Sequence, residues 1–356
     1  MSPYPGKVHL PSRANASNTP IAQLHFKKVI DQLLPLLPEE KRSKVRCRRL
    51  SAKTHSYHLL RAPSQVQFIL LSGEHTGYRH DTDRELLFRQ ESNFFYLSGC
   101  DLPSSALLLV YDPSDKKYES HLLIPEEDPL ETMWSPPPPS LGAARGMYDA
   151  TALGYASQLV TILHKLLAAH PDAVVHTLPK GTNLFPTLHP EFTSGKFADT
   201  NTEQYFLTAI HCARLIKTEA EIALMRRANE ISSRAHEVVM RLLGQGVLDL
   251  SQPAKSTGTP NLPADWRITR EAEAEAVFVA SCRREGAIHQ AYMPIVAAST
   301  RASTLHYCCN DKEFAWGPEV HSKADIECDH QHGCFAPQVL LIDAGCEWKN
   351  YAADSE

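Results

Sequence analysis

Two aspartates near the end of the chain have residue types and a spacing that indicate chemistry. Asp343 follows the apolar run Val339–Ile342, and Asp354 comes eleven residues after it. If a hairpin turns at Trp348–Lys349, these two positions lie opposite each other, with Cβ atoms about 5 Å apart on one face. Two carboxylates so close repel each other, so one takes a proton or the pair binds a cation. Carboxylate oxygens suit Mn²⁺, Mg²⁺ or a pair of such ions.

The spacing alone leaves two alternatives to a metal site. The hairpin register can differ from the one assumed, or Asp354 can be a solvated residue near the end of the chain. A third candidate residue, His306 in Leu305-His306-Tyr307, fits an ordinary polar strand position when it is taken without its context.

Residues 311–336 form a segment with an unusual density of metal-binding residue types. Their spacings match no zinc finger, so an exposed polar loop or retained non-coding sequence translated in frame explains them better than a zinc site does. The candidates in it are His321, Cys328, Asp329, His330, His332 and Cys334.

The elements expected to position these residues begin with an α/β domain. Short apolar runs predict buried strands, and a stripe at helical spacing from Leu159 to Leu167 predicts a helix between the last two. Strands that alternate with a helix in this way are typical of an α/β domain. The predicted strands are residues 66–71, 106–111, 121–124 and 174–178.

A long helix is predicted to open the second half of the chain. Thr218 and Glu221 have the spacing of a capping box, and an apolar stripe follows at steps of three and four. The stripe consists of Leu224, Ala228, Ile231, Ala235, Val238 and Leu242. After it we expect an inserted loop, a helix and two strands, at 243–268, 269–282, 292–298 and 337–342.

Composition excludes several classes of function. The 356 residues are 43% apolar and 22% charged, which is typical of a globular protein. A net charge of −5 and a pI near 6.4 provide no basic surface for binding nucleic acid. The sequence also contains no apolar run of 18 residues, the length that a membrane-spanning helix needs. Nine cysteines without a Cys-x-x-Cys pair, and an N-terminus without a secretory signal, favour a cytoplasmic location.

Four motifs, in the expected order, resemble the aminopeptidase P and prolidase family. They are the run from Asp81 to Gly99, then Tyr292-Met-Pro-Ile-Val296, Leu305-His306-Tyr307 and Leu341-Ile-Asp-Ala-Gly-Cys-Glu-Trp348. The resemblance implies a metal-dependent Xaa-Pro aminopeptidase, which removes the N-terminal residue from peptides with proline in second position. It also implies an N-terminal α/β domain followed by a catalytic domain of pita-bread (α+β) fold.

The resemblance implies roles for individual residues as well. Members of the family bind two divalent ions, usually Mn²⁺, through five ligands. The first two ligands match Asp343 and Asp354, and a histidine that approaches the substrate carbonyl matches His306. Because the bond before proline has no N–H group, a metal-polarised carbonyl suits this substrate. The implied partners are proline-containing peptides or dipeptides and a second copy of the chain in a homodimer, with no nucleic acid and no membrane.

The sequence departs from the family pattern at its end and at one loop. The family's remaining ligands, one histidine and two glutamates, lie downstream of Asp354. We therefore expect a C-terminally truncated member with an incomplete pita-bread domain. Ser299-Thr300-Arg301 stands where the family has glycine, which affects the loop that carries His306.

These departures set the predicted organisation and keep two further functions open. We predict a flexible arm at residues 1–24, the N-terminal domain at 25–205 and the partial catalytic domain at 206–356, with insertions at 243–268 and 311–336.

The alternative function is a catalytically dead homologue that acts as a binding or oligomerisation module. A creatinase-like hydrolase on the same fold is a third candidate, which the N-terminal motif disfavours.

Overall fold

A computed structural model describes most of the chain in two compact units, Met1–Ile216 and Lys217–Glu356. Much of the predicted arm and of both predicted insertions lies outside the described residues, and so do all six metal-binding candidates between His321 and Cys334. The described residues are 21–37, 65–179, 203–248, 268, 270–307, 309–312 and 339–354.

The first unit is built on a five-stranded mixed sheet with the strand order β4-β3-β2-β1-β5. Neighbouring strands are antiparallel from β1 to β3, whereas β1 with β5 and β3 with β4 are parallel. The strands are β1 (Gln67–Ser72), β2 (Ala106–Asp112), β3 (Lys117–Ile124), β4 (Ala152–Tyr155) and β5 (Val174–His176).

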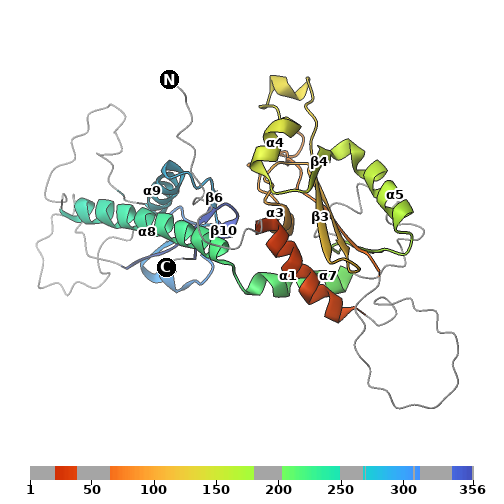
Figure 1. Cartoon of the computed structure of the whole chain (residues 1–356). Coiled ribbons are helices and arrows are strands. Elements are labelled where there is room, and N and C mark those ends of the chain that lie inside the picture. Colours follow the sequence, from red (N-terminus) through yellow and green to blue (C-terminus); the bar gives the residue numbers. More distant parts are fainter. Residues whose placement is uncertain are drawn as a thin grey trace, which may run out of the picture. The chain divides into compact units, whose positions relative to one another are not determined.

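Helices cover both faces of this sheet, with α1 and α7 on one side and α5 on the other (Figure 1). Strand β1 is therefore buried on both faces: Ile69 and Leu71 pack toward α1 and α7, while Phe68 and Leu70 pack toward α5. A strand buried on both faces is apolar at every position rather than at alternate ones. The helices are α1 (Ile21–Leu36), α3 (Ser92–Ser98), η1 (Glu131–Met133), α4 (Leu141–Met147), η2 (Ala156–Gln158), α5 (Leu159–Ala169) and α7 (Glu203–Leu215).

The strands and the helix predicted for this unit are confirmed, with two differences at its ends. Helix α1 begins at Ile21, inside the predicted arm, because the apolar side chains of Phe26, Ile30 and Leu33 are buried in the core. The first unit also runs past residue 205, because α7 packs against α1.

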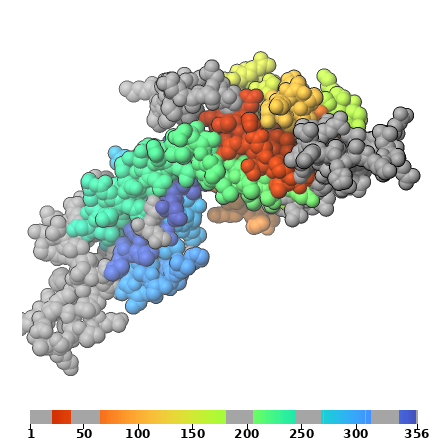
Figure 2. All heavy atoms as spheres, turned by 60° about the horizontal axis from the view of Figure 1, so that its bottom comes forward, coloured from red at the N-terminus to blue at the C-terminus, as the bar shows by residue number. Residues whose placement is uncertain are grey.

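The second unit combines two helices with two small sheets. Helix α8 packs on α9, and their buried side chains form one core with the strands. Residues of β10 lie against α8 on the surface of this unit, in blue and green in Figure 2. The elements are α8 (Glu219–Leu248), α9 (Glu271–Arg284), β6 (His289–Gln290), β7 (Ile295–Ala298), η7 (Ser299–Ser303), β8 (Leu340–Asp343), β9 (Cys346–Trp348) and β10 (Tyr351–Ala352).

The predicted long helix is confirmed, with a later end and one corrected core position. Thr218 and Glu221 form the expected capping box, with the Thr218 amide 2.7 Å from a Glu221 carboxylate oxygen. The helix continues to Leu248 instead of ending before residue 243. Val239 is buried while Val238 is 40% exposed, because the position four residues after Ala235 faces the core.

No helix in the described part of the chain has both the length and the apolar character needed to cross a membrane.

Candidate metal centre

The hairpin that carries Asp354 turns one residue later than the sequence predicted. Trp348 pairs with Tyr351, so the turn residues are Lys349 and Asn350, with φ of 50° and 62°. Positive φ at both central residues matches the two-residue turn that joins tight hairpins. In this register Ala353 lies beside Cys346, with its amide 2.9 Å from the Cys346 carbonyl oxygen. The predicted pairing of Asp343 with Asp354 is therefore wrong.

The pairing fails because no single strand runs from Asp343 to Trp348. Strand β8 ends at Asp343, which pairs with Ile295 of β7, and β9 starts at Cys346 and pairs with β6. The chain changes sheets at Ala344 and Gly345. At Gly345 an added Cβ would lie 2.0 Å from the Ala353 carbonyl oxygen, so only glycine allows this close approach.

The two aspartates nevertheless converge, on the hydroxyl of Tyr292. This hydroxyl lies 3.1 Å from Asp354 Oδ1 and also hydrogen bonds to Asp343 Oδ1. A phenol carries one proton, so it donates to one carboxylate at a time. Asp343 is half-buried and Asp354 is exposed. The structure thus brings together two predicted ligands from separate strands.

This donor set fits a hard divalent cation, because carboxylate oxygens are its preferred ligands and one of the two groups is open to solvent. Nearby contacts fix the backbone between the strands: His236 Nε2 lies 2.9 Å from the Ala344 carbonyl oxygen. Within the described residues, no group of three or more His, Cys, Asp or Glu side chains could hold a metal ion. Asp343 and Asp354 are thus a pair of candidate ligands within the described residues.

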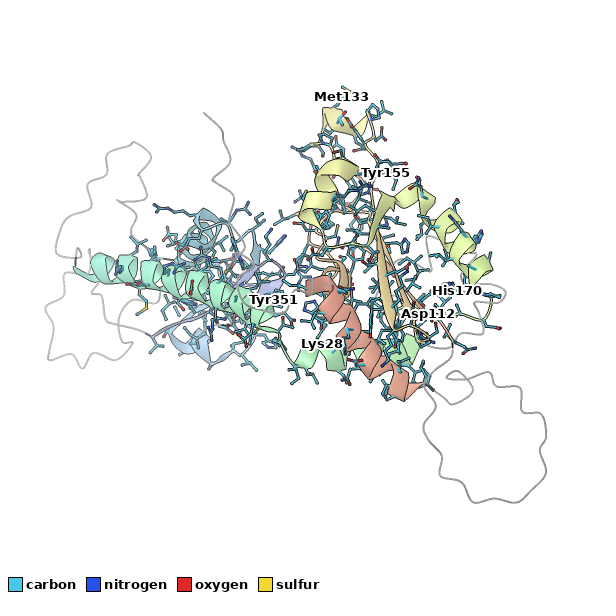
Figure 3. The ribbon with its side chains drawn as sticks, viewed as in Figure 1. Lys28, Asp112, Met133, Tyr155, His170 and Tyr351 are labelled. Carbon is cyan, nitrogen blue, oxygen red and sulfur yellow. The ribbon has the colours of Figure 1, made fainter. Side chains whose placement is uncertain are left out.

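The same hairpin is attached to α8. Tyr351, labelled in Figure 3, donates its hydroxyl proton to Glu221 at 3.2 Å. The guanidinium carbon of Arg227 lies over the Trp348 ring, 5.5 Å from the ring centroid. Both contacts place the start of α8 against the strands that carry Asp354.

His306 is not bonded to either aspartate in the described part of the chain. Its side chain is exposed in the turn after η7 and makes no hydrogen bond or ion pair with Asp343 or Asp354 in the described part of the structure. The neighbouring Tyr307 is buried and donates to Glu271 Oε2 at 2.8 Å. Burial, helped by this bond to a carboxylate, raises the pKa of Tyr307 to about 12.

Sequence reasoning missed two residues of this region, Tyr292 and Glu271. Tyr292 lies within one of the four motifs, but a phenol is an uncommon choice of metal ligand, so the motif drew no attention to it. Glu271 lies in the first turn of α9, where a glutamate normally only complements the helix dipole. Their partners are distant in sequence, and no local pattern signals such contacts.

Two family models match the chain in succession. The model of the aminopeptidase P N-terminal domain matches residues 44–176, and that of metallopeptidase family M24 matches residues 223–356. The first match falls within the first unit, and the second covers most of the second unit, including Tyr292, Asp343 and Asp354.

Curated relatives match the chain over part of their own length. A probable Xaa-Pro aminopeptidase of Paracoccidioides brasiliensis (strain Pb03) is 33% identical over 80% of this chain and 51% of its own length. One from Aspergillus fumigatus (strain CBS 144.89) is 31% identical over 88% of this chain and 56% of its own length. The chain spans about half the length of the curated relatives it matches.

Solved structures share the fold. Aminopeptidase P from E. coli in a low-pH form superposes with a TM-score of 0.60 and 20% identity, over 94% of this chain and 61% of that one. Proline aminopeptidase P II from Yersinia pestis gives the same values. A further E. coli aminopeptidase P structure is zinc-substituted.

The two domain matches in this order place the chain in metallopeptidase family M24, with an aminopeptidase P N-terminal domain before it. The chain belongs to the Xaa-Pro aminopeptidase family, a group of metal-dependent hydrolases.

Proposed function

We propose that the protein is a manganese-dependent Xaa-Pro aminopeptidase, which hydrolyses the bond between an N-terminal residue and a following proline. The observation that carries the proposal is the convergence of Asp343 and Asp354 on the Tyr292 hydroxyl inside an M24 domain. The names of the curated relatives support the substrate class. Oxygen donors alone favour manganese over softer metals.

In this mechanism the two aspartates hold the metal ions and Tyr292 orients their carboxylates. When bound, the ions supply Lewis-acid polarisation of the scissile carbonyl and activation of water. The exposed ring of His306 donates a hydrogen bond to the substrate oxygen as that oxygen becomes negative. Such a site needs no amide proton on the substrate, which is why a bond to proline can be cleaved.

Several finer properties belong to the same proposal. The second unit forms part of a pita-bread domain that takes two ions, the substrates include dipeptides and longer peptides, and the protein acts as a homodimer in the cytoplasm. Free thiols at Cys100, Cys212, Cys282, Cys309 and Cys346 support the reducing compartment.

The test is metal binding and hydrolysis by the purified, metal-free 356-residue chain. Calorimetric titration with Mn²⁺, and with Zn²⁺ for comparison, should show binding that weakens at least tenfold in Asp343→Asn and Asp354→Asn. The matched control is Asp149→Asn, which removes an exposed aspartate of the first unit. A peptide with proline in second position should lose its N-terminal residue only when Mn²⁺ is present. Equal affinity in all four proteins would refute the metal site.

The alternative, a catalytically inactive homologue that acts as a binding or oligomerisation module, is favoured by one observation. The described residues supply two metal ligands and no cluster of three. This alternative gains support if light scattering gives a dimer mass while the titration shows no Mn²⁺ binding. Manganese-stimulated release of the N-terminal residue would exclude it.

A further inference from the structure

The loop that carries His306 starts and ends in unfavourable backbone conformations. Ser299 has φ of 56° and Asn310 has φ of 48°, both in the left-handed region. Asparagine tolerates that region, but serine pays the usual steric penalty of a side chain there. A residue held in such a conformation persists only when its surroundings fix it. The loop therefore depends on contacts from outside itself.

Four of those contacts come from one buried carboxylate. Glu271, in the first turn of α9, has a side chain that is 0% exposed. Its oxygens accept four hydrogen bonds from residues before, within and after the turn of His306. The donors are the Ala298 amide (2.9 Å), Arg301 Nε (2.8 Å), the Tyr307 hydroxyl (2.8 Å) and the Lys312 amide (3.3 Å).

The backbone of Glu271 joins the same loop, since its amide donates to the Lys312 carbonyl oxygen at 3.0 Å. One turn further along α9, Glu275 accepts a bond from Asn310 Nδ2 at 3.1 Å. Asn310 in turn accepts the Val296 amide at 2.9 Å. Helix α9 thus holds both ends of the loop through two glutamates four residues apart.

The distribution of these partners separates Glu271 from an ordinary core residue. All four donors lie between residues 298 and 312, and none lies on α8 or on the hairpin of β9 and β10. A buried carboxylate is stable only when its oxygens are fully paired. Each oxygen here accepts two donors, so exchanging one oxygen for an NH₂ group leaves two of these loop donors without an acceptor.

We propose that Glu271 is the positioning residue for His306, because it fixes the loop between Ala298 and Lys312 and with it the backbone from which the imidazole projects. The catalytic meaning of this positioning rests on the proposed function, in which His306 meets the substrate. The positioning itself is a property of the loop and can be measured without substrate.

The deciding experiment uses the full chain and compares Glu271→Gln with Glu237→Gln, a control at an exposed ion pair with Arg241 on α8. In Glu271→Gln we expect the Ala298 and Lys312 amides to exchange hydrogen at least tenfold faster, while the amides of α8 keep their rates. The ¹⁵N–¹H ring signals of His306 should shift or broaden in Glu271→Gln and stay unchanged in the control.

Two outcomes overturn the inference. One is an unchanged His306 ring signal with unchanged loop amides in Glu271→Gln. The other is equal acceleration of the α8 amides, which would make Glu271 a general support of the unit. If Glu271→Gln does not fold, Tyr307→Phe removes one donor and keeps the ring. It should perturb the same ring signal, and an unperturbed signal contradicts the proposal.

Hydrolysis of a Xaa-Pro peptide with Mn²⁺ separates the two proposals. Glu271→Gln should lower kcat with KM unchanged, and adding it to His306→Gln should lower kcat no further. Full activity in His306→Gln would remove the catalytic role of His306, and no hydrolysis by the unaltered chain would count against the proposed function. In either case the ring and amide measurements still decide the role of Glu271.

Discussion

Tyr292 holds the two aspartates together through a single atom, its hydroxyl oxygen. Tyr292→Phe keeps the ring and removes this shared partner. We expect Mn²⁺ affinity to fall about 10–100-fold, as it commonly does when a residue that orients metal ligands is lost. The free energy of unfolding should change by only about 1 kcal/mol. Calorimetric titration and urea unfolding measure the two effects.

The control for Tyr292→Phe is Tyr78→Phe, because Tyr78 is exposed on the first unit. It should change neither quantity. Unchanged Mn²⁺ affinity in Tyr292→Phe would show that the aspartates are held by other contacts.

The pKa of Glu271 predicts how the stability of the second unit changes in acid. Burial pushes the pKa of this carboxyl upward, but hydrogen bonds from the Ala298 amide, Arg301, Tyr307 and the Lys312 amide outweigh burial and lower it. The folded pKa then lies below the unfolded value of about 4.3. Stability from this group is complete above about pH 4.3 and is lost as pH falls through the folded pKa.

The measurement for this acid effect is urea unfolding of the second unit at pH 6, 4 and 3. The unaltered chain should lose more free energy of unfolding below pH 4.3 than Glu271→Gln does. The comparison is needed because Glu285, whose pKa is lowered by its bond with Arg234, titrates in the same window. Identical pH profiles would mean that Glu271 is not held ionised by its four donors.

At this scale the sequence marked the two candidate aspartates more clearly than the residues that contact them. Asp343 and Asp354 are marked by residue type, by spacing and by their motif. Tyr292 and Glu271 act on partners 27 to 62 residues away, so their roles depend on how β7, β8 and α9 pack. The assignment of His306, Asp343 and Asp354 to catalysis stays a prediction that the proposed titrations test.

Among the elements, the hairpin of β9 and β10 shows why a wrong register still brought the aspartates together. Moving the turn from Trp348–Lys349 to Lys349–Asn350 shifts the pairing by two residues. Side chains alternate with a period of two, so a shift of two keeps every residue on its face. Asp354 therefore keeps its predicted face of the hairpin, and the Tyr292 hydroxyl joins it to Asp343 across the change of sheet at Ala344 and Gly345.

The close approach of the backbone between β8 and β9 predicts that a side chain at Gly345 destabilises the second unit. In Gly345→Ala the new Cβ would meet the Ala353 carbonyl oxygen at 2.0 Å, so the hairpin must move. We expect a loss of about 3 kcal/mol in the free energy of unfolding of the second unit. Gly244→Ala is the control, because a Cβ on this exposed α8 residue meets no atom within 4 Å.

Gly244→Ala should instead gain about 0.5–1 kcal/mol from better helix propensity. Urea unfolding of the two variants gives both numbers. Equal stability of Gly345→Ala and the unaltered chain would contradict the close packing between Gly345 and Ala353.

Elements whose apolar residues recur at regular spacing were predictable from the sequence. Elements without such a regular spacing were not. Strand β1 and helix α8 are long apolar patterns that stand out in the sequence. The first four residues of helix α1 were predicted as part of a polar arm, because they continue a polar segment, and no helix was predicted over the rest of α1. Helix α7 is stabilised by packing on α1, and β6 has two residues, so neither has a pattern of its own.

For the whole molecule, the two units have separate hydrophobic cores, with no residue shared among the described clusters. The sequence predicted a change of domain after residue 205, a position that falls inside α7. The boundary depends on which core α7 joins, and that is a property of the tertiary fold.

Because the cores are separate, we expect a substitution in one core to destabilise only the unit that contains it. Leu70→Ala in the first unit and Phe278→Ala in the second each remove a fully buried side chain. Each should cost about 3–4 kcal/mol through lost burial and the cavity left behind. In differential scanning calorimetry we expect Leu70→Ala to lower the transition of the first unit only and Phe278→Ala that of the second only. If either substitution lowers both transitions together, the two units unfold as one cooperative body, and the Gly345 and acid effects would then extend to the whole chain.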